Sequence, residues 1–355
     1  MGESTVSTGV SGKMVHLEVI RILAVCLVVL NHTDVYFLYF SETSHPATYA
    51  VSLFASVLCR INVPLFFMVS GALLLKKKES IRELYRKRVA RMLAVLVLFS
   101  AVQYLAAGFL GDLDGGMGAA DFFSRLYTGQ VLDSYWFLYA YLGVLIALPF
   151  LRKLAWGMEE AEFRYLFALK VLFDIVFRLA AVYTGDTVRV EALLVTDPVF
   201  YLFAGYYMEW VADRKLFVMR GMRKGLPAAL CILLVFGSMG LVYLEYRVKG
   251  VYTQDCLGIF APFLTIIVYG MVKSFCGRHV LPERMQHAVL YLGSTVFGVY
   301  LVEKLVRKQL LPLYLYLCGR TVGLAACLVY VAGTLVLSVV YVSIGKKIPF
   351  LKRLL

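Results

Sequence analysis

Several features of a soluble or secreted protein are missing from this sequence of 355 residues. Charged residues account for only 17% of it, and the longest connection between apolar runs, residues 111–134, is too short to fold alone. The seven cysteines are scattered and show neither a CxxC pair nor the spacing of metal ligands. We therefore expect reduced cysteines, no disulfide framework, no metal site and no appended soluble domain.

A cleavable signal sequence is also missing. Residues 1–11 are rich in serine, threonine and glycine, and Glu3 is their only charged residue. A signal peptide would need a basic segment and a cleavage site made of small residues. We therefore expect the first apolar run, residues 17–40, to stay in the protein as a membrane span. The sequence also lacks a convincing internal repeat.

Apolar residues dominate what is present. They make up 61% of the chain, the mean hydropathy is +0.77, and apolar runs of about 18 residues or more recur. This composition predicts an all-α polytopic membrane protein with about ten transmembrane helices. The expected spans are residues 15–40, 50–75, 90–110, 135–152, 165–184, 193–211, 226–245, 257–275, 287–306 and 321–344. We expect one membrane domain, residues 15–345, between a tail of residues 1–14 and a basic tail of residues 346–355.

The formal net charge of +13 is concentrated between the predicted spans. Three segments are basic: residues 76–91, 214–224 and 346–353. The connections that alternate with them are neutral or acidic: residues 41–49, 111–134 and 185–191. Basic connections usually face the cytoplasm, so we expect both termini to be cytoplasmic. One basic group falls on the predicted outer side: Lys304, Arg307, Lys308 and Arg320. The charge is mostly a topology signal and gives little support to nucleic-acid binding.

Arg21 and His32 lie in the first apolar run, where an ionisable side chain is costly unless it faces a bundle interior or a wet cavity. Eleven steps of about 100° bring both side chains to one helix face, roughly 16 Å apart along the axis. A neutral imidazole accepts a proton near pH 7, so His32 is a candidate general base; a packed histidine is the alternative. Its neighbour Asn31 favours a cavity. Glu18, one turn before Arg21, is expected to pair with the arginine and orient it.

Two further segments suggest ligand contacts. Ser70 and Gly71 follow Pro64 and allow close approach of a helix or a ligand, although such residues are ordinary in membrane helices. Arg88 and Arg91 lie three positions apart at the predicted cytoplasmic face. Their guanidinium groups suit a phosphate-rich ligand; a topology signal with contact to anionic membrane lipids is the alternative.

The fifth predicted span carries Lys170, Asp174 and Arg178, each four positions apart. We interpret them as an internal ion-pair ladder with a structural role. A coupling site of a secondary transporter or exporter is the rival interpretation. The absence of paired broken helices argues against a transporter. A purely structural subunit would have no need of Arg21 and His32 inside a span.

Three segments together resemble the acyltransferase-3 family of integral membrane acyltransferases. Arg21 and His32 are similar to its arginine–ten residues–histidine signature, and residues 63–71 are similar to its Pro-x-Phe-Phe-x-x-Ser-Gly segment. Arg88 and Arg91 are similar to its arginine pair. Weaker matches are residues 135–138 and 293–301. The resemblance extends over nearly the whole chain. No single motif is specific to this family, but the ordered set of segments is.

The resemblance implies transfer of an acyl group, usually acetyl from acetyl-CoA, to a hydroxyl of a cell-envelope glycan or its lipid-linked precursor. In that case His32 would be the catalytic base, and Ser70 with Gly71 would shape the pocket. The CoA donor or the acyl path would be held by Arg21, Arg88 and Arg91. The resemblance also implies a multi-pass protein of the bacterial cytoplasmic membrane. It does not specify the acceptor, the acyl length or the oligomeric state.

Two positions depart from the family pattern. Members often have histidine where this chain has Tyr135, just before Trp136, and where it has Glu303. Either Glu303 replaces a polar group on the acceptor side or the acceptor itself differs. We assign five residues to acceptor binding or orientation: Glu18, Asn31, Tyr135, Trp136 and Glu303. Direct attack on the thioester and a covalent acyl-enzyme both stay open, because no cysteine or serine has a visible activating partner.

Overall fold

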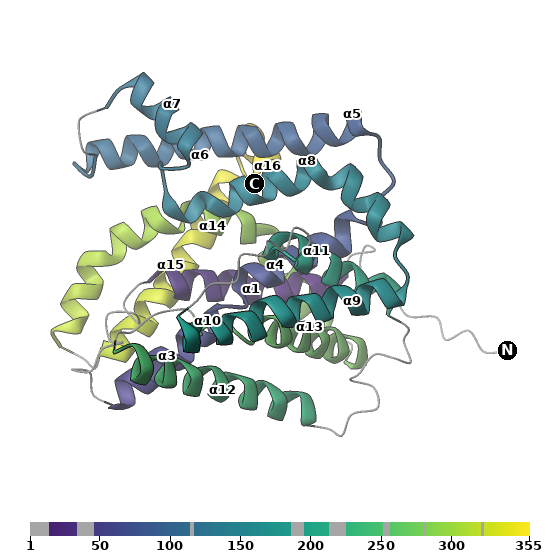
Figure 1. The fold of residues 1–355 in the computed structure, drawn as a ribbon. Helices are drawn as coiled ribbons and strands as arrows, with labels where there is room; N and C mark the ends of the chain where they lie inside the picture. Colours follow the sequence, from purple (N-terminus) through teal and green to yellow (C-terminus); the bar gives the residue numbers. More distant parts are fainter. Residues whose placement is uncertain are drawn as a thin grey trace.

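The computed structural model describes residues 14–33, 46–113, 117–185, 195–212, 225–250, 256–279, 281–320 and 323–355. Within these ranges the ordered elements are helical and no residue lies in a β-strand (Figure 1). In chain order, they are α1 (Val15–His32), α3 (Pro46–Cys59), α4 (Asn62–Leu74), α5 (Ile81–Leu84), the π-helical η1 (Tyr85–Val89), α6 (Ala90–Phe109), α7 (Ala119–Thr128), the 3₁₀ turn η2 (Asp133–Tyr135), α8 (Trp136–Gly157), α9 (Glu160–Val171), the π-helical η3 (Leu172–Phe177), α10 (Arg178–Thr184), α11 (Asp197–Tyr206), the π-helical η4 (Tyr207–Val211), α12 (Leu226–Lys249), α13 (Ala261–Arg278), α14 (Glu283–Cys318), α15 (Gly323–Gly345) and α16 (Pro349–Leu354).

Seven helical segments in the described part of the chain are long and apolar enough to cross a membrane. They are Val15–His32, Pro46–Leu74, Ile81–Phe109, Asp133–Gly157, Leu226–Lys249, Glu283–Cys318 and Gly323–Gly345. The protein is therefore a multi-pass α-helical membrane protein.

The other three predicted spans coincide with helices that are shorter or more polar. The span at 165–184 is a composite of α9, η3 and α10 and contains the charged ladder. The span at 193–211 is α11 followed by η4, and the span at 257–275 is α13, which carries Lys273 and Arg278 near its end. The count of ten spans and the cytoplasmic location of the termini stay predictions. The basic residues 214–224 lie outside the described residues.

Several boundaries differ from the predicted ones. The predicted span 50–75 is broken at Arg60 and Ile61 into α3 and α4. The basic segment 76–91 is helical from Ile81 onward and continues into α6. α14 runs on to Cys318, so Arg307 and its basic neighbours belong to a helix, not to an outer loop. This extension has a local cause, because Arg307 pairs with Glu303 one turn before it. The end of the first predicted span, residues 34–40, lies outside the described residues.

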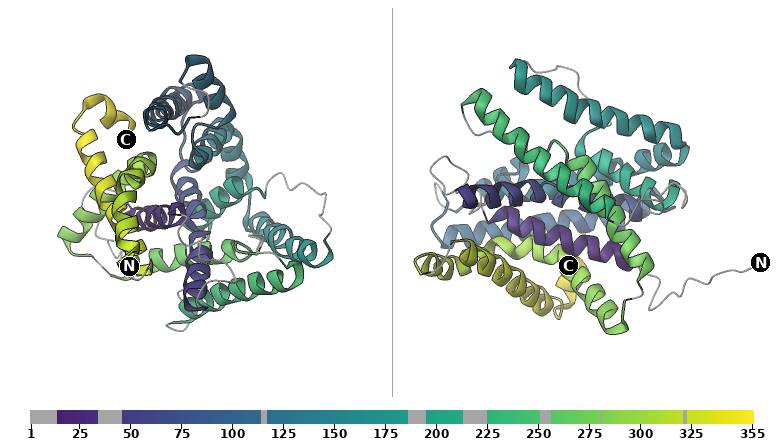
Figure 2. Two further views of the ribbon diagram at one scale, coloured as in Figure 1. Left: turned by 90° about the vertical axis from the view of Figure 1, so that its left-hand side faces the viewer. Right: turned by 90° about the horizontal axis from the view of Figure 1, so that it is seen from below.

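α1 lies in the middle of the bundle and packs against α4, α13, α14 and α15 (Figures 1 and 2). Its buried apolar side chains recur at helical spacing: Leu17, Ile20, Ala24, Val25, Val28 and Val29. Its first turn is fixed by His16, whose Nε2 lies 2.9 Å from Glu209 Oε1 in η4. Tyr269 and Lys273 of α13 also donate to the Glu209 carboxylate, at 2.8 and 3.0 Å. This cluster joins α1 to two other elements and fixes the register of Arg21 and His32.

α4 and α11 cross with their backbones in close contact. A Cβ atom on Gly71 would lie 1.8 Å from the carbonyl oxygen of Leu202 in α11, and one on Gly205 would lie 1.9 Å from the carbonyl oxygen of Met68 in α4. Small residues allow this approach in membrane helices. The crossing places the cavity-lining residues of α4 beside those of α11.

Most residues of the predicted basic tail are helical. Its residues form α16, which packs against α6. Arg91 Nη2 donates to the Leu354 carbonyl at 2.9 Å, and the Leu355 side chain packs near Gly298 and Gly345. α16 therefore sits beside the arginines of η1 and α6.

Candidate active site

His32 ends α1 and is held by two residues of α14. Its Nδ1 lies 2.8 Å from Glu303 Oε1, and the Glu303 side chain is only 1% exposed. Arg307 Nε donates to Glu303 Oε2 at 2.6 Å, and Arg307 Nη1 also donates to the His32 backbone carbonyl. That carbonyl is among those that a helix leaves unpaired at its C-terminus, so Arg307 both caps α1 and fixes the carboxylate. Tyr330 of α15 donates to the Arg307 carbonyl at 2.9 Å.

This arrangement determines what the imidazole can do. An ionised carboxylate only accepts hydrogen bonds, so the proton of a neutral His32 is assigned to Nδ1 and the lone pair to Nε2. A histidine with a carboxylate on Nδ1 is oriented and stabilised once Nε2 takes a proton. Glu303, which departs from the family pattern, is therefore the orienting partner of His32.

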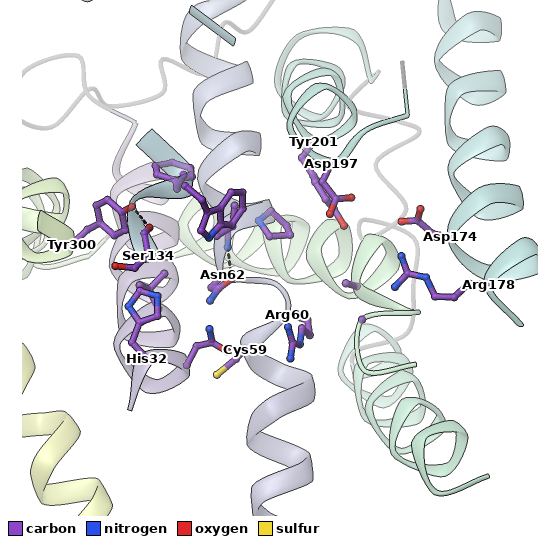
Figure 3. A pocket seen from close by; sticks show the side chains of 18 residues that line it. His32, Cys59, Arg60, Asn62, Ser134, Asp174, Arg178, Asp197, Tyr201 and Tyr300 are labelled. Atoms are coloured by element: carbon purple, nitrogen blue, oxygen red, sulfur yellow. Dashed lines mark hydrogen bonds between the residues drawn. The ribbon is translucent and has the colours of Figure 1, made fainter. Parts of the chain in front are cut away.

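His32 lines a cavity of about 350 Å³. We call it the acceptor cavity after the role that the sequence predicts for Asn31 and Trp136 in its wall. Asn31, Asn62, Ser134 and Trp136 also line this cavity. Figure 3 shows Asn62 and Ser134 near His32. The cavity continues to a charged group that lies away from His32 in Figure 3: Asp174, Arg178 and Asp197. The predicted acceptor-side residues Asn31 and Trp136 thus share a cavity with His32.

The predicted arginines line a second cavity of about 490 Å³. We call it the donor cavity after the role that the family resemblance implies for them. Arg21, Arg88 and Arg91 all line it, as do Lys77 and Lys87. Residues from α1, η1, α6 and the segment after α4 thereby bring their cationic groups together. Such a set of cations suits a ligand with several phosphates.

Each arginine is fixed by a protein partner. Arg21 Nη1 donates to Glu18 at 3.0 Å, which is the predicted pair one turn apart. Gly293 of α14 leaves space for the Glu18 side chain, because a Cβ atom on residue 293 would lie 2.2 Å from Glu18 Oε2. Arg88 Nε donates to Glu79 at 2.9 Å, and Arg91 binds the Leu354 carbonyl. The donor cavity is thus lined by cations whose positions are set before any ligand arrives.

Glu79 connects the donor cavity to the end of α4. Arg152 Nη2 donates to Glu79 at 2.8 Å, and Arg152 Nε donates to the Leu74 carbonyl at 2.9 Å. Burial alone would raise the pKa of Glu79, but hydrogen bonds and charge from Arg152 and Arg88 hold that pKa below its ordinary value. Glu79 is therefore an anion at neutral pH. Two indole N–H groups bind further carbonyls near the end of α4, from Trp156 to Leu75 and from Trp210 to Ala72, both at 2.8 Å.

The two cavities share a wall. Val28, Val63, Phe137 and Tyr300 line both of them. The rings of Phe137 and Tyr300 meet edge to face with centroids 5.6 Å apart, and the Tyr300 hydroxyl donates to the Ser134 carbonyl. Arg21 on the donor side and His32 on the acceptor side therefore lie on either side of Val28 along one face of α1, as their spacing predicts.

Two predicted site residues occupy packing positions. Gly71 lines neither cavity and instead lies against the Leu202 backbone, whereas Ser70 lines the donor cavity and its hydroxyl donates to the Phe66 carbonyl at 2.8 Å. Tyr135 is 1% exposed and donates to the Leu301 carbonyl at 2.8 Å. Ligand binding by either residue stays a prediction. Gly71 allows a helix crossing, and Tyr135 anchors α14 two residues before Glu303.

Sequence reasoning missed several residues of the site. The sequence places Arg307 among the basic residues of an outer connection and gives no signal for Ser134. Phe137 and Tyr300 fall within the two weaker family matches but have no predicted role. A signal for Arg307 was present, because an arginine four positions after a glutamate in an apolar run predicts an ion pair. Within the described residues, no group of three or more His, Cys, Asp or Glu side chains is arranged to hold a metal ion.

The charged ladder has one partner beyond those predicted. Lys170 Nζ lies 2.9 Å from Asp174 Oδ2, as the spacing predicts, and 2.6 Å from Asp197 Oδ1 at the start of α11. Arg178 lines the acceptor cavity together with both carboxylates. The group thus joins α9 to α11 and forms part of the cavity wall.

The chain matches the model of a known protein family. A family model described as an acyltransferase domain, the acyltransferase-3 family, matches residues 14–343, which is nearly the whole chain. No curated protein and no solved structure gives a significant match.

Proposed function

Because the chain belongs to the acyltransferase-3 family and is therefore a membrane acyltransferase, we propose that it moves an acetyl group from acetyl-CoA to a hydroxyl. The acceptor in this proposal is a cell-envelope glycan or its lipid-linked precursor, and the membrane is the bacterial cytoplasmic membrane. Family membership sets aside the transporter alternative. Glycan O-acetylation is the form of acyl transfer that we propose.

The observation that carries the proposal is the Glu303–His32 pair beside the wall between the two cavities. A cation-lined cavity suits the phosphates of CoA, and a cavity lined by asparagine, serine and tryptophan side chains suits a hydroxyl-bearing acceptor. His32 lies on the acceptor side, where a base must meet the hydroxyl. The shared wall of Val28, Val63, Phe137 and Tyr300 is where the thioester and the hydroxyl would meet.

The chemistry follows from this placement. Nε2 of His32 takes the proton of the acceptor hydroxyl while its oxygen attacks the thioester carbonyl carbon. Glu303 stabilises the imidazolium that forms, and Arg307 keeps the carboxylate in place. The carbon–sulfur bond then breaks, and the proton on His32 passes to the CoA thiolate. One ester forms, one thioester is lost, and the protein returns to its starting state.

The predicted orientation agrees with this scheme. Arg88 and Arg91 belong to the basic segment expected at the cytoplasmic face, where CoA is available. His32 lies at the opposite end of α1 from the predicted cytoplasmic N-terminus. The donor would therefore enter from the cytoplasm and the acceptor from the middle or outer part of the membrane.

Arg91→Gln is expected to weaken acetyl-CoA binding by about 10-fold or more, because a charge-assisted contact to phosphate is lost. Binding should be measured by titration of protein in nanodiscs. Acetyl-pantetheine, which carries none of the CoA phosphates, provides the internal comparison, since its binding should be unchanged in the variant. Arg164→Gln is the control, because Arg164 is exposed and pairs with Glu160 on the surface of α9. Equal losses for both donors would contradict a phosphate contact.

Cys59→Ala and Ser134→Ala test direct attack against a covalent route. Both residues line the acceptor cavity with His32, and the Ser134 hydroxyl is buried with no hydrogen-bond partner in the described part of the chain. Direct attack predicts that each variant keeps acetyl transfer within about 3-fold of wild type, because no acyl-enzyme forms. Rates should be followed by CoA release, and intact-protein mass spectrometry of the wild type should look for the added mass of one acetyl group. An adduct that disappears in one variant together with activity would establish the covalent route.

A further inference from the structure

The proposed reaction creates a negative charge, and its stabilisation needs a hydrogen-bond donor near the shared wall. When the acceptor attacks, the thioester carbonyl oxygen becomes an oxyanion, and donors aimed at that position contribute much of the rate enhancement of many enzymes. The wall itself is formed by apolar and aromatic side chains: Val28, Val63, Phe137 and Tyr300. Negative charge beside such a wall is costly unless a donor meets it.

Several polar groups near the wall are unsuited to this task. Tyr300 donates its one hydroxyl proton to the Ser134 carbonyl. The Ser134 hydroxyl oxygen is enclosed and does not open into the cavity. Arg60 also lines the acceptor cavity, but in the view of Figure 3 it lies toward the charged ladder, with Asn62 between it and His32. The side chain of Asn62 is therefore the donor to consider.

The orientation of the Asn62 amide is set by its own backbone. Asn62 begins α4, directly after the break that follows α3, and it is only 8% exposed. Its Oδ1 atom accepts the Val63 N–H at 2.6 Å. A backbone N–H group can only donate, so this contact assigns the oxygen end of the amide to Val63 and turns the NH₂ end away. Because Val63 lines both cavities, the amide lies beside the shared wall.

The NH₂ group of Asn62 opens into the acceptor cavity. Among the described residues, Val63 is the hydrogen-bond partner of this side chain, and the Nδ2 atom is neither bonded nor enclosed. Asn62 lines the cavity together with His32, and Figure 3 shows the two side chains near each other. A largely buried donor without a partner costs free energy. An acceptor atom of a bound reactant would remove that cost.

The start of α4 favours an anion at the same place. The N-terminus of this helix of 13 residues carries partial positive charge and borders the cavity. Its backbone N–H groups are nevertheless occupied or missing. Asn62 binds the Val63 N–H, and Pro64 has none. The Leu65 N–H donates to the Ile61 carbonyl at 3.0 Å. The amide of Asn62 is thus the donor that this end of α4 presents to the cavity.

We propose that Asn62 is a catalytic residue whose Nδ2 donates a hydrogen bond to the thioester oxygen and stabilises the oxyanion. This inference rests on the proposed function and adds a second group that acts on the reacting atoms. As the acceptor oxygen bonds to the carbonyl carbon, His32 takes its proton and the carbonyl electron pair moves onto the oxygen held by Asn62. That pair then re-forms the carbonyl, the carbon–sulfur bond breaks, and the thiolate leaves with the proton from His32.

Infrared spectroscopy tests the contact without requiring turnover. Full-length His32→Ala protein in nanodiscs is loaded with acetyl-CoA that carries ¹³C at the acetyl carbonyl. A hydrogen bond to a carbonyl oxygen weakens the carbon–oxygen double bond and lowers its stretching frequency. The thioester band should therefore move to higher frequency when Asn62→Ala is added to His32→Ala. An identical band in the two proteins, with acetyl-CoA bound to both, overturns the proposal.

Turnover distinguishes a donor from a residue that only fixes the start of α4. Hydrolysis of acetyl-CoA, followed as CoA release without an acceptor, passes through an oxyanion at the same carbonyl. Asn62→Ala should lower kcat by about 10²- to 10³-fold and leave the acetyl-CoA dissociation constant unchanged. An ionised Asn62→Asp side chain keeps an oxygen for the Val63 N–H but has no donor, so it should be at least as slow. Recovery of the rate in Asn62→Asp would show a structural role and overturn the proposal.

The matched control is Gln286→Ala. Its amide also lies in the first turn of a helix, α14, where it donates to the Leu281 carbonyl at 2.8 Å, and it lines neither cavity. This variant should change neither the band nor the rate. If the wild type turns over and Asn62→Ala stays within about 3-fold of it, far less than the loss of an oxyanion donor, the inference fails and the proposed function stands. Failure of the wild type to bind or consume acetyl-CoA overturns the proposed function instead.

Discussion

Replacing His32 by alanine should lower acetyl transfer by about 10²- to 10⁴-fold, the range for loss of a positioned general base. Binding of acetyl-CoA should persist, because His32 lines the acceptor cavity and not the donor cavity. The measurement is CoA release together with donor titration on the same nanodisc preparation. Loss of donor binding along with turnover would contradict the division of the site into two cavities.

Glu303→Gln tests the same general-base role of His32 more specifically, because glutamine has nearly the same shape as glutamate. Arg307 can only donate hydrogen bonds, so the oxygen of the new amide must face Arg307 and the amide NH₂ group must face His32 Nδ1. Nδ1 would then accept, and the proton would move to Nε2, the atom that has to act as the base. We expect kcat to fall by about 10²-fold or more with little change in the acetyl-CoA dissociation constant.

A matched control for Glu303→Gln is Glu245→Gln in α12. Glu245 is also 1% exposed and also pairs with a cation four positions later, Lys249 at 3.1 Å. It lines neither cavity. Both variants lose a buried carboxylate with its ion pair, so both should lose stability. Only Glu303→Gln should lose turnover in the protein that stays folded, and equal activity losses would reduce Glu303 to a structural role.

Gly71→Ala is expected to have the largest effect on folding. Its Cβ atom would lie 1.8 Å from the Leu202 carbonyl oxygen, a backbone atom that cannot move without shifting α11. Overpacking of this kind costs about 1–3 kcal/mol and occasionally more. We therefore expect a lower melting temperature and a lower yield of folded protein in detergent. Gly205→Ala should behave alike, because its Cβ would meet the Met68 carbonyl oxygen at 1.9 Å.

Gly143→Ala in α8 is the control for this packing effect. No atom lies within 4 Å of the Cβ position at Gly143, so alanine meets no obstacle there. Alanine is favoured over glycine in a helix by up to about 1 kcal/mol, and the melting temperature should stay equal or rise. A Gly71→Ala protein that melts like the wild type but binds acetyl-CoA weakly would restore the ligand-contact role that the sequence suggests for Gly71.

The parts of the site that were predictable depend on short stretches of chain. Arg21 and His32 share a face of α1 because helical geometry places residues eleven apart in nearly the same direction. The Glu18–Arg21 and Lys170–Asp174 pairs formed as expected, since residues three and four apart are neighbours on a helix surface. Arg88 and Arg91 line one cavity even though Arg88 lies in a π-helical turn.

The parts that were not predictable depend on packing between distant segments. Glu303 lies 271 positions from His32 in the sequence, and Asp197 reaches Lys170 from a separate helix. The role of Gly71 could not be read locally either, because a small residue in an apolar run permits a ligand contact and a helix crossing equally well. The seven clearly apolar spans follow from composition, whereas the helices that carry the charged ladder are too polar to be identified as membrane spans by length and hydropathy.

The sequence by itself determined the class of this protein: apolar runs specify membrane helices, and the ordered family segments specify an acyltransferase. These properties are carried by composition and by spacing along one helix. Only the tertiary structure decided that Glu303 and Arg307 hold the proposed catalytic histidine, that Val28, Val63, Phe137 and Tyr300 separate a donor from an acceptor cavity, and that the charged ladder lines the latter. The physical reason is that these contacts arise where helices cross, and the crossings are set by the packing of the whole bundle.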